Sequence, residues 1–515
     1  MRNLGLLDRH QPRSLVEQRQ PLHFRSLFIP ALLIMAIGAF QIGTIRDGQG
    51  WGDDFAEYIL QTKHMATGQG FVPYEFIPNP ATMLGGQAYP PLLSVLLLPA
   101  YLIFGLNLYP MKIIGIVCVL VGLWFINLVF KDWLPLAWRC ILIVLVGICP
   151  RLFDMRDGIE SETPFLLFFF LCIYLLQRAY TEAPEPPPAL RWSVLVGLSL
   201  FAAEATRNTG AALFPVVLTL DLIHFRRLTR FAMLSVVIGA VPSAILSVLL
   251  RTGGGYLAYY NFSPMWLIRS AYLFSKNSET VWWGTMPRWP GYLAAFAAGA
   301  VCLWGLYVRL RQRPGAVEFA TFWYLCIVLP YFAPQYWQYF VPVLPIYLAY
   351  ILVGIRDVQT KLSSVAVGRF VTAAAIIVMA LLYATAYARA DWGAYHEGIS
   401  DPQFLNVCDF IRSHTQRSDV ILFRKPRLLA LMTERRASVY PIHDDRVSEP
   451  SELWDYAGKV GAKYIIACDV TAGLIDPDAA NGNRSLALFL EVYRGRVNLA
   501  YQVPHFRVYR LMGTT

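Results

Sequence analysis

The chain has 515 residues, of which 56% are hydrophobic and only 15% are charged, and its mean hydropathy is +0.45. Soluble domains carry about 25% charged residues, so this composition excludes a water-soluble protein, and it equally excludes a disordered or disulfide-rich chain. The formal net charge of +10 does not indicate nucleic-acid binding, because the basic residues lie in separate clusters between apolar runs. Long continuous apolar runs predict a polytopic α-helical membrane protein rather than a barrel.

The N-terminal part begins with a polar, basic segment, residues 1–25, which we expect in the cytoplasm. The first apolar run, 26–45, is long enough to span a bilayer as a retained anchor. Residues 46–90 then form a long acidic loop. Within this loop, the pattern of residues 54–65 predicts a short amphipathic helix at the membrane interface.

Eleven further apolar runs follow, and together with the first they predict about 11–13 transmembrane helices. The run at 91–107 contains Pro91 and Pro99, so it is either a partial crossing or wrongly bounded, and the sequence leaves both interpretations open. The eleven runs are 91–107, 110–130, 137–150, 161–177, 192–206, 208–224, 230–250, 289–310, 318–333, 339–356 and 370–389.

The basic residues indicate the orientation, since cytoplasmic loops are enriched in lysine and arginine. Clusters at 224–230, 309–313 and 355–369 predict the cytoplasmic side, and the loop at 131–139 favours the same side. This topology places the loops 46–90 and 251–288 outside, together with all residues after 390. The loop 251–288 is long enough to form a lid over a site.

Residues 391–515 change character and predict a soluble extracytoplasmic α/β domain, which leaves 26–390 as the transmembrane module. Residues 476–483 have the composition of a loop. We expect helices at 402–414, 426–433, 449–460 and 485–494, strands at 419–423, 437–440 and 463–468, and a hairpin at 497–511.

Adjacent carboxylates at Asp53 and Asp54, followed by Glu57, stand just after the first spanning run. A carboxylate there can act as a general base toward a hydroxyl or bind a divalent metal. Equally, aspartate favours helix N-caps, and acidic pairs are common on solvated surfaces. The motif alone leaves the catalytic and the structural interpretation open.

A second charged segment, residues 151–162, alternates acids such as Asp157 and Glu162 with bases such as Arg156. Charged residues at a membrane edge often mark function, although the segment could also be a solvated connector. Arg207 lies between two apolar runs, where a guanidinium either binds a phosphate or snorkels to the interface. Tyr89 and Tyr339 belong to segments rich in proline and aromatic residues at the ends of predicted helices. Such segments could contribute to a site, but an aromatic belt at the membrane interface explains them equally well.

Taken in order, these motifs resemble the GT-C class of integral-membrane glycosyltransferases. The similarity extends to protein O-mannosyltransferases and to bacterial aminoarabinose transferases that use polyprenyl-phosphate sugars, and it covers about residues 26–390. The sequence departs from the family pattern at two points: it has Asp53-Asp54 instead of Asp-Glu, and Gln338 instead of an arginine. The matching motifs are Asp53-Asp54 with Glu57, Tyr89-Pro-Pro, Arg156-Asp157, Ser161-Glu162, Thr206-Arg207 and Tyr339 to Pro345.

The resemblance implies transfer of a sugar from a polyprenyl-phosphate donor to an acceptor hydroxyl of a lipid, glycan or protein. The reaction would invert the anomeric centre on the extracytoplasmic face of a bacterial inner membrane. Asp53 or Asp54 would be the base, Asp53 matching the first acid of the family pair, and Asp157 would orient the acceptor or share that role. Arg207 would meet the phosphate. We expect further substrate contacts from Glu57, Lys63, Tyr89, Arg156, Glu162 and Tyr339, and no nucleic-acid partner.

Whether the reaction needs a divalent metal ion stays open on the sequence. Two other classes of protein share the number of helices. A transporter would place polar or broken helices at mid-membrane depth, whereas the acids here gather in the loops. A non-catalytic component of envelope polysaccharide assembly or export would not need those clustered acids.

Overall fold

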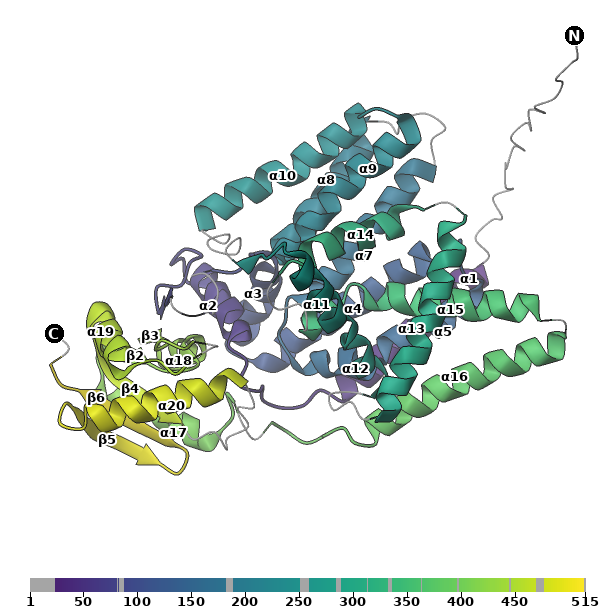
Figure 1. Cartoon of the computed structure of the whole chain (residues 1–515). Coiled ribbons are helices and arrows are strands. Elements are labelled where there is room, and N and C mark those ends of the chain that lie inside the picture. The colour runs from purple at the N-terminus through teal and green to yellow at the C-terminus, as the bar shows by residue number, and fades with distance from the viewer. Residues whose placement is uncertain are drawn as a thin grey trace, which may run out of the picture.

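A computed structural model describes most of the chain as a helical bundle with a small C-terminal sheet beside it (Figure 1). The described residues are 24–80, 82, 88–181, 189–250, 259–283, 289–312, 314–331, 336–362, 364–395, 398–443, 446–468 and 477–513.

Every apolar run predicted from the sequence forms a helix, which confirms the α-helical fold class. Shorter helices connect these runs: α2 (Asp54–Ala66), α6 (Pro150–Asp154), η1 (Met155–Asp157), η2 (Asn208–Ala212), α11 (Pro264–Ser275), α12 (Asn277–Trp283) and η4 (Trp337–Tyr339). The helices of the apolar runs are α1 (Phe24–Gly43), α3 (Leu92–Phe104), α4 (Leu108–Val129), α5 (Leu136–Gly147), α7 (Glu162–Thr181), α8 (Ala189–Thr206), α9 (Leu213–Phe225), α10 (Arg230–Leu250), α13 (Trp289–Leu310), α14 (Ala316–Val328), α15 (Leu344–Lys361) and α16 (Val365–Tyr387).

Six helices in the described part of the chain are long and apolar enough to cross a bilayer, and α5 with its bent continuation into α6 makes up to seven. These helices make the chain an integral membrane protein. Helix α3 has 13 residues and therefore extends about 20 Å, less than the about 30 Å of a hydrocarbon core. The structure thus favours a partial crossing for residues 91–107 and leaves α4 as the full-length helix between residues 91 and 130.

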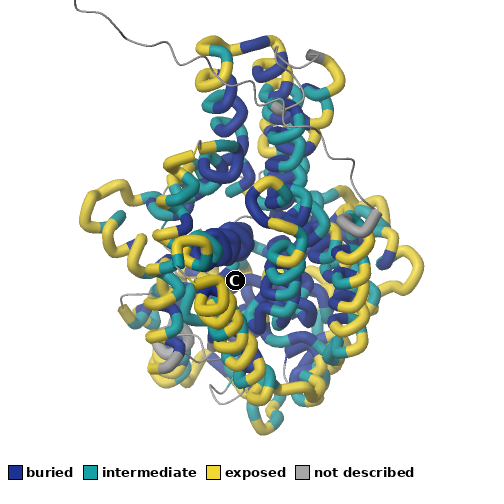
Figure 2. Tube along the Cα trace, turned by 90° about the vertical axis from the view of Figure 1, so that its right-hand side faces the viewer, coloured by how far each residue is buried: buried dark blue, intermediate teal, exposed yellow. Residues whose placement is uncertain are grey.

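In each of the peripheral helices α10, α13 and α16, only 11% of the most apolar stretch of the helix is buried inside the protein. Most of their surface is therefore free to contact lipid. Figure 2 shows these exposed outer faces around a buried interior. Inside the bundle, α13 and α15 approach so closely that a Cβ added to Gly305 would lie 1.9 Å from the backbone oxygen of Tyr350. Small residues allow this kind of backbone contact between membrane helices.

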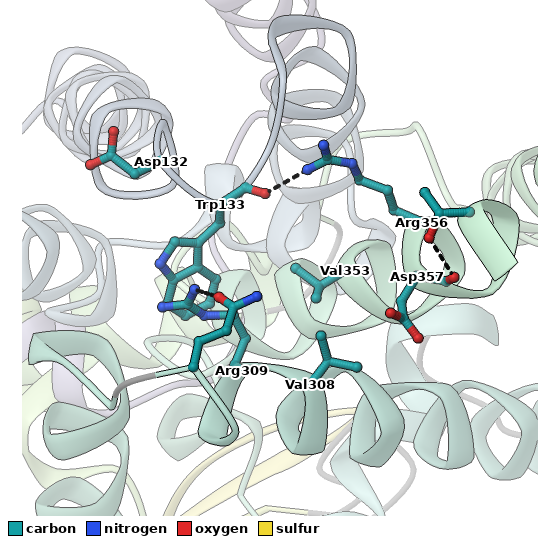
Figure 3. Close-up of a pocket in the computed structure, with 9 residues that line it drawn as sticks. Asp132, Trp133, Val308, Arg309, Val353, Arg356 and Asp357 are labelled. Atoms are coloured by element: carbon teal, nitrogen blue, oxygen red, sulfur yellow. Dashed lines mark hydrogen bonds between the residues drawn. The ribbon is translucent and has the colours of Figure 1, made fainter. Parts of the chain in front are cut away.

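Three segments predicted to face the cytoplasm meet around one cavity of 310 Å³ (Figure 3). The Arg309 guanidinium lies 4.0 Å from the centre of the Trp133 ring. Arg356 Nη1 donates a 3.0 Å hydrogen bond to the backbone oxygen of Trp133. The structure therefore places the loops near residues 131–139, 309–313 and 355–369 side by side, as a shared membrane face requires.

The C-terminal segment forms a mixed sheet, as its alternating pattern predicts. In the described residues the strand order is β1-β3-β2-β4-β6-β5, parallel from β1 to β4 and antiparallel from β4 to β5. The elements are β1 (Phe76–Ile77), α17 (Pro402–His414), β2 (Val420–Leu422), α18 (Pro426–Thr433), β3 (Arg436–Ser438), α19 (Pro450–Val460), β4 (Ala462–Cys468), α20 (Pro477–Val492), β5 (Val497–Val503) and β6 (Phe506–Leu511).

One expectation for this segment is wrong. Residues 477–483 are not a loop but the first two turns of α20. Pro477 is the first residue of that helix, a position where proline is favoured because its missing N–H has no partner in the first turn anyway.

The acidic loop 46–90 joins this C-terminal sheet, which the sequence did not predict. Strand β1 pairs in parallel with β3, aligning Phe76 with Ala437. Helix α2 forms as predicted, and nine of its 13 residues are buried against the rest of the protein. It packs against α3 and α18, and Figure 1 shows it between the bundle and the sheet.

Candidate active site

The three acids at the start of α2 lie on two different faces of the helix. On a helix, residues four apart share a face, so Asp53 and Glu57 lie together while Asp54 shares its face with Tyr58. Asp53 and Glu57 are buried, whereas the Asp54 side chain is 66% exposed. The adjacent aspartates therefore have different environments, and only Asp54 is open to a substrate.

Arg427 of α18 inserts its fully buried side chain among these acids. Its Nε atom lies 3.2 Å from Glu57 Oε2, and its Nη1 atom lies 3.8 Å from Asp53 Oδ2. The backbone N–H of Leu428 also donates a 3.2 Å hydrogen bond to Asp53 Oδ1. Asp53 thus sits at the N-terminus of α18, where the helix dipole favours a negative charge. These contacts give Asp53 and Glu57 a structural role in docking α18 on α2.

One guanidinium faces three carboxylates in this cluster, so it cannot neutralise them all. Burial raises the pKa of Glu57 to about 8 and also raises the pKa of Asp53, although Arg427 opposes both shifts. Burial alone would lower the pKa of Arg427, but Tyr89, Glu57 and the aspartates raise it above its ordinary value. Arg427 therefore stays charged, while Glu57 favours its protonated form near neutral pH.

Tyr89 connects Arg427 with Asp54. The Tyr89 hydroxyl donates a 2.6 Å hydrogen bond to Asp54 Oδ1 and accepts one of 2.7 Å from Arg427 Nη1. The distance from Arg427 Nη1 to Asp54 Oδ1 is 3.4 Å. The Tyr58 ring packs beside Tyr89, with centroids 5.2 Å apart. Asp54 is therefore held in one orientation while much of its surface remains accessible.

A second cluster surrounds Arg207, which lies between α8 and η2. Arg207 forms an ion pair with Glu162 at the start of α7, and its Nη1 atom donates a 3.0 Å hydrogen bond to Ser161 Oγ. The Tyr339 ring centre lies 5.5 Å from its guanidinium carbon. The turn after Arg207 requires Gly210, because a Cβ there would lie 2.5 Å from the backbone of α8.

The two clusters interact through Tyr58 and Glu160. Burial raises the pKa of the Tyr58 hydroxyl, on which Arg207 and Glu162 of one cluster and Asp54 of the other also act. Burial and the negative charge of Glu162 raise the pKa of Glu160, which also experiences the charges of Asp54 and Arg207. Asp54, Glu162 and Arg207, which belong to separate sequence motifs, therefore all act electrostatically on Tyr58 and Glu160.

Two other predicted residues, Asp157 and Arg156, belong to a different group. Asp157 Oδ1 accepts a 2.8 Å hydrogen bond from the backbone N–H of Arg46, and Asp157 Oδ2 lies 3.1 Å from Arg156 Nη1. Arg156 also donates two hydrogen bonds to the backbone oxygen of Thr44. Both Asp157 oxygens are engaged in tying η1 to the chain that follows α1.

The remaining predictions concern Lys63 and the loop 251–288. Lys63 forms a 2.6 Å ion pair with Glu434 of the C-terminal segment. The described part of the loop forms α11 and α12, and Tyr260 pairs with Tyr331, whose ring contacts Tyr339. Residues 251–258 and 284–288, the rest of the expected lid, lie outside the described residues.

Sequence reasoning missed two residues of this site, Arg427 and Tyr58. A signal for Arg427 was present, because it is the one charged residue in the otherwise apolar stretch from Pro426 to Met432. A charged side chain there must find a buried partner or interrupt the packing. For Tyr58, its position four residues after Asp54 places it on the same helical face.

The residues of the site do not form a set of metal ligands. Among the side chains that the structure describes, no three His, Cys, Asp or Glu are placed to hold one ion. Among the α2 acids, Asp53 and Glu57 already face the Arg427 guanidinium. We therefore derive no step that involves a metal ion.

No family model and no curated protein matches the sequence. Three solved structures are similar in fold. ArnT from Cupriavidus metallidurans, bound to undecaprenyl phosphate, is 12% identical with a TM-score of 0.56 over 94% of this chain and 97% of that chain. The Archaeoglobus fulgidus oligosaccharyltransferase is 13% identical with a TM-score of 0.58, over 95% and 73%.

The third is the arabinofuranosyltransferase AftD from Mycobacteria, 12% identical with a TM-score of 0.52. The match covers 95% of this chain and 41% of the AftD chain. These similarities extend over the bundle and the C-terminal segment alike. The order of the helices, the acidic first loop and the structural relatives together give this chain the fold of the GT-C membrane glycosyltransferases.

Proposed function

We propose that this protein is a glycosyltransferase that moves a sugar from a polyprenyl-phosphate donor to an acceptor hydroxyl, with inversion at the anomeric carbon. The observation that carries the proposal is an exposed carboxylate, Asp54, which Tyr89 holds in a GT-C fold. Its charge acts on Tyr58 and Glu160 together with the charges of Arg207 and Glu162. Two structural relatives support a lipid-phosphate donor: ArnT was solved with undecaprenyl phosphate, and the archaeal AglB with a dolichol-phosphate and a peptide.

Asp54 is the general base of the proposed reaction, in place of Asp53. The Asp53 carboxylate is buried and already accepts a hydrogen bond from the Leu428 N–H, so it cannot reach an acceptor hydroxyl without undocking α18. The hydrogen bonds to Asp54 from Tyr89 and from Arg427 both reach Oδ1, so Oδ2 keeps its lone pairs for the incoming hydroxyl. Geometry near the substrate decides which of two neighbouring acids can act as a base.

In the chemical step, Asp54 takes the proton of the acceptor hydroxyl, whose oxygen then forms a bond to the anomeric carbon. The bond between that carbon and the phosphate oxygen breaks, and the polyprenyl phosphate leaves with the electron pair. Arg207 stabilises the charge on the leaving phosphate, since a guanidinium has five N–H donors and Glu162 and Ser161 engage only Nη1 in the described contacts.

The proposed orientation follows from the basic clusters. Loops near residues 131–139, 309–313 and 355–369 meet on one face, which we assign to the cytoplasm together with the N-terminus. The candidate site and the C-terminal domain then face the extracytoplasmic side of a bacterial inner membrane. The acceptor is a hydroxyl of a lipid, a glycan or a protein.

The test uses purified protein in liposomes that contain radiolabelled undecaprenyl-phosphate hexoses or pentoses, with envelope extract as the acceptor source. We expect one donor to lose its label to an acceptor while undecaprenyl phosphate accumulates. Asp54→Asn should abolish this reaction, whereas Asp409→Asn, at an exposed carboxylate on α17, should not. A donor that crosses the bilayer intact would instead identify a transporter, and failure to consume any donor would contradict the proposal.

A further inference from the structure

A second cavity, of 540 Å³, lies where α2 and α3 meet the C-terminal elements α17 and α18. It is separate from the candidate active site, since Asp54, Tyr89 and Arg207 do not line it. The residues around it are Lys63, Tyr101, Leu106, Arg412, Arg417, Leu431, Met432, Thr433, Glu434 and Arg435.

The cavity is strongly basic. Four basic side chains and one acidic side chain line it, a formal net charge of +3. Glu434 lies 2.6 Å from Lys63 Nζ and 3.2 Å from Arg417 Nη2. The Arg417 side chain is 82% exposed, so its ion pair with Glu434 is weak. Arg417 can therefore leave Glu434 and bind another anion.

Arg435 forms the fixed part of the basic wall. Its side chain is buried, and its Nη2 atom donates hydrogen bonds to the backbone oxygens of Arg412 and Thr415 at 2.8 and 3.1 Å. These bonds hold the loop that follows α17, and with it Arg412 and Arg417, beside Lys63 of α2. The cavity is therefore a built site in which charges from two distant parts of the chain converge.

The other side of the cavity is apolar. Tyr101 and Leu106 line it at the end of α3. Between them in the sequence lie two of the most exposed apolar side chains of the described residues. Ile103 is 72% exposed and Leu102 is 63% exposed. In a membrane protein, a short helix that ends in such residues meets the acyl chains of the bilayer. Basic residues beside such a surface attract anionic lipids.

We propose that this cavity binds the phosphate headgroup of an anionic lipid whose acyl chains pack against the end of α3. Arginine side chains suit this ligand because they can bind phosphate oxygens in pairs. Since Lys63 belongs to α2 and Arg412 and Arg417 to the C-terminal domain, one headgroup bridges both. The lipid holds the domain against the membrane, and this role does not depend on the proposed sugar transfer.

The experiment uses the full chain in nanodiscs that mix phosphatidylglycerol with phosphatidylcholine, followed by native mass spectrometry of the lipids retained. Wild type should retain phosphatidylglycerol selectively and saturably. Arg412→Glu with Arg417→Glu should weaken that retention by about tenfold or more, because each basic residue near a membrane surface contributes about 1 kcal/mol. The Arg412 side chain is 46% exposed and that of Arg417 is 82% exposed, so neither is part of the core and the exchange leaves the fold intact.

The matched control is Lys459→Glu with Arg494→Glu, which removes the same charge from exposed positions of the same domain outside the cavity. It should retain phosphatidylglycerol as wild type does. Equal loss in both double variants, or no loss in either, would overturn the site. A titration of inorganic phosphate in detergent separates the two sources of phosphate, because saturable binding of phosphate alone at this site would overturn the lipid assignment.

Discussion

The Tyr89 hydroxyl donates a hydrogen bond of 2.6 Å to Asp54, and the same oxygen accepts one of 2.7 Å from Arg427. The chain of contacts begins in α18 of the C-terminal segment and ends on the exposed acid of the first loop. The C-terminal domain is thus part of the support of the candidate base, and is not merely attached to the bundle.

Removal of the Tyr89 hydroxyl should slow sugar transfer without unfolding the protein. A hydrogen bond to a charged group contributes about 1.5–3 kcal/mol, so we expect Tyr89→Phe to lower the rate by about tenfold or more. Initial rates with saturating donor measure this effect. Tyr74→Phe is the control, since Tyr74 is exposed. A Tyr89→Phe enzyme with the wild-type rate would show that Tyr89 does not position Asp54.

Loss of the Arg427 charge should loosen the whole interface between α2 and α18. Arg427→Met leaves the buried Asp53 carboxylate without its cation, and breaking a buried ion pair from one side costs about 3–5 kcal/mol. The variant should therefore melt well below wild type in a thermal unfolding experiment. Arg494→Met, at an exposed position of the same domain, should melt as wild type does. Equal melting temperatures for Arg427→Met and wild type would contradict the interface.

Glu57 should make the stability depend on pH. Its pKa is raised by burial from 4.5 to about 8 in the folded protein. Between these values the unfolded chain releases a proton that the folded chain keeps, so stability is greatest below about pH 4.5 and falls as the pH rises toward 8. Melting temperatures across this range should fall less steeply for Glu57→Gln. Glu491→Gln, at an exposed glutamate, should leave the slope unchanged, and identical slopes in all three proteins would refute the role of Glu57.

Substitutions in the Arg207–Glu162 ion pair should distinguish a structural role of Arg207 from a role in sugar transfer. Arg207→Ala strands the buried Glu162 carboxylate and should destabilise the protein by about 3–5 kcal/mol. Adding Glu162→Gln removes the stranded charge, so the double variant should regain much of its melting temperature. The double variant should still not transfer sugar, because it has no guanidinium at position 207 to stabilise the charge on the leaving phosphate. Recovered transfer in the double variant would assign Arg207 to structure alone.

Local patterns in the sequence were sufficient to predict most elements. Apolar runs of about 20 residues and prolines at helix starts are signals within a single element. They placed the helices of the bundle and, in the C-terminal segment, the helices 402–414 and 426–433 at the bounds that the structure gives.

Contacts between distant segments could not be predicted in this way. Phe76 pairs with Ala437, 361 positions later, and Arg427 reaches Asp53 across a similar separation. The sequence also favoured Asp53 over Asp54 as the general base, because Asp53 matches the first acid of the acidic pair in the family pattern. One residue turns a side chain by about 100° on a helix, and which face stays open depends on where α18 docks.

The central claim is that Asp54 is the general base and Asp53 a structural residue, and one comparison tests it. Release of polyprenyl phosphate per folded protein is measured for Asp53→Asn and Asp54→Asn beside their melting temperatures. We predict that Asp54→Asn melts as wild type but releases product at least about a hundredfold more slowly. Asp53→Asn turns a hydrogen bond to a charged group into one to a neutral group, so it should lose about 1 kcal/mol of stability yet keep transferring sugar. The reverse pattern, with Asp53→Asn stable and inactive and Asp54→Asn active, would contradict the account.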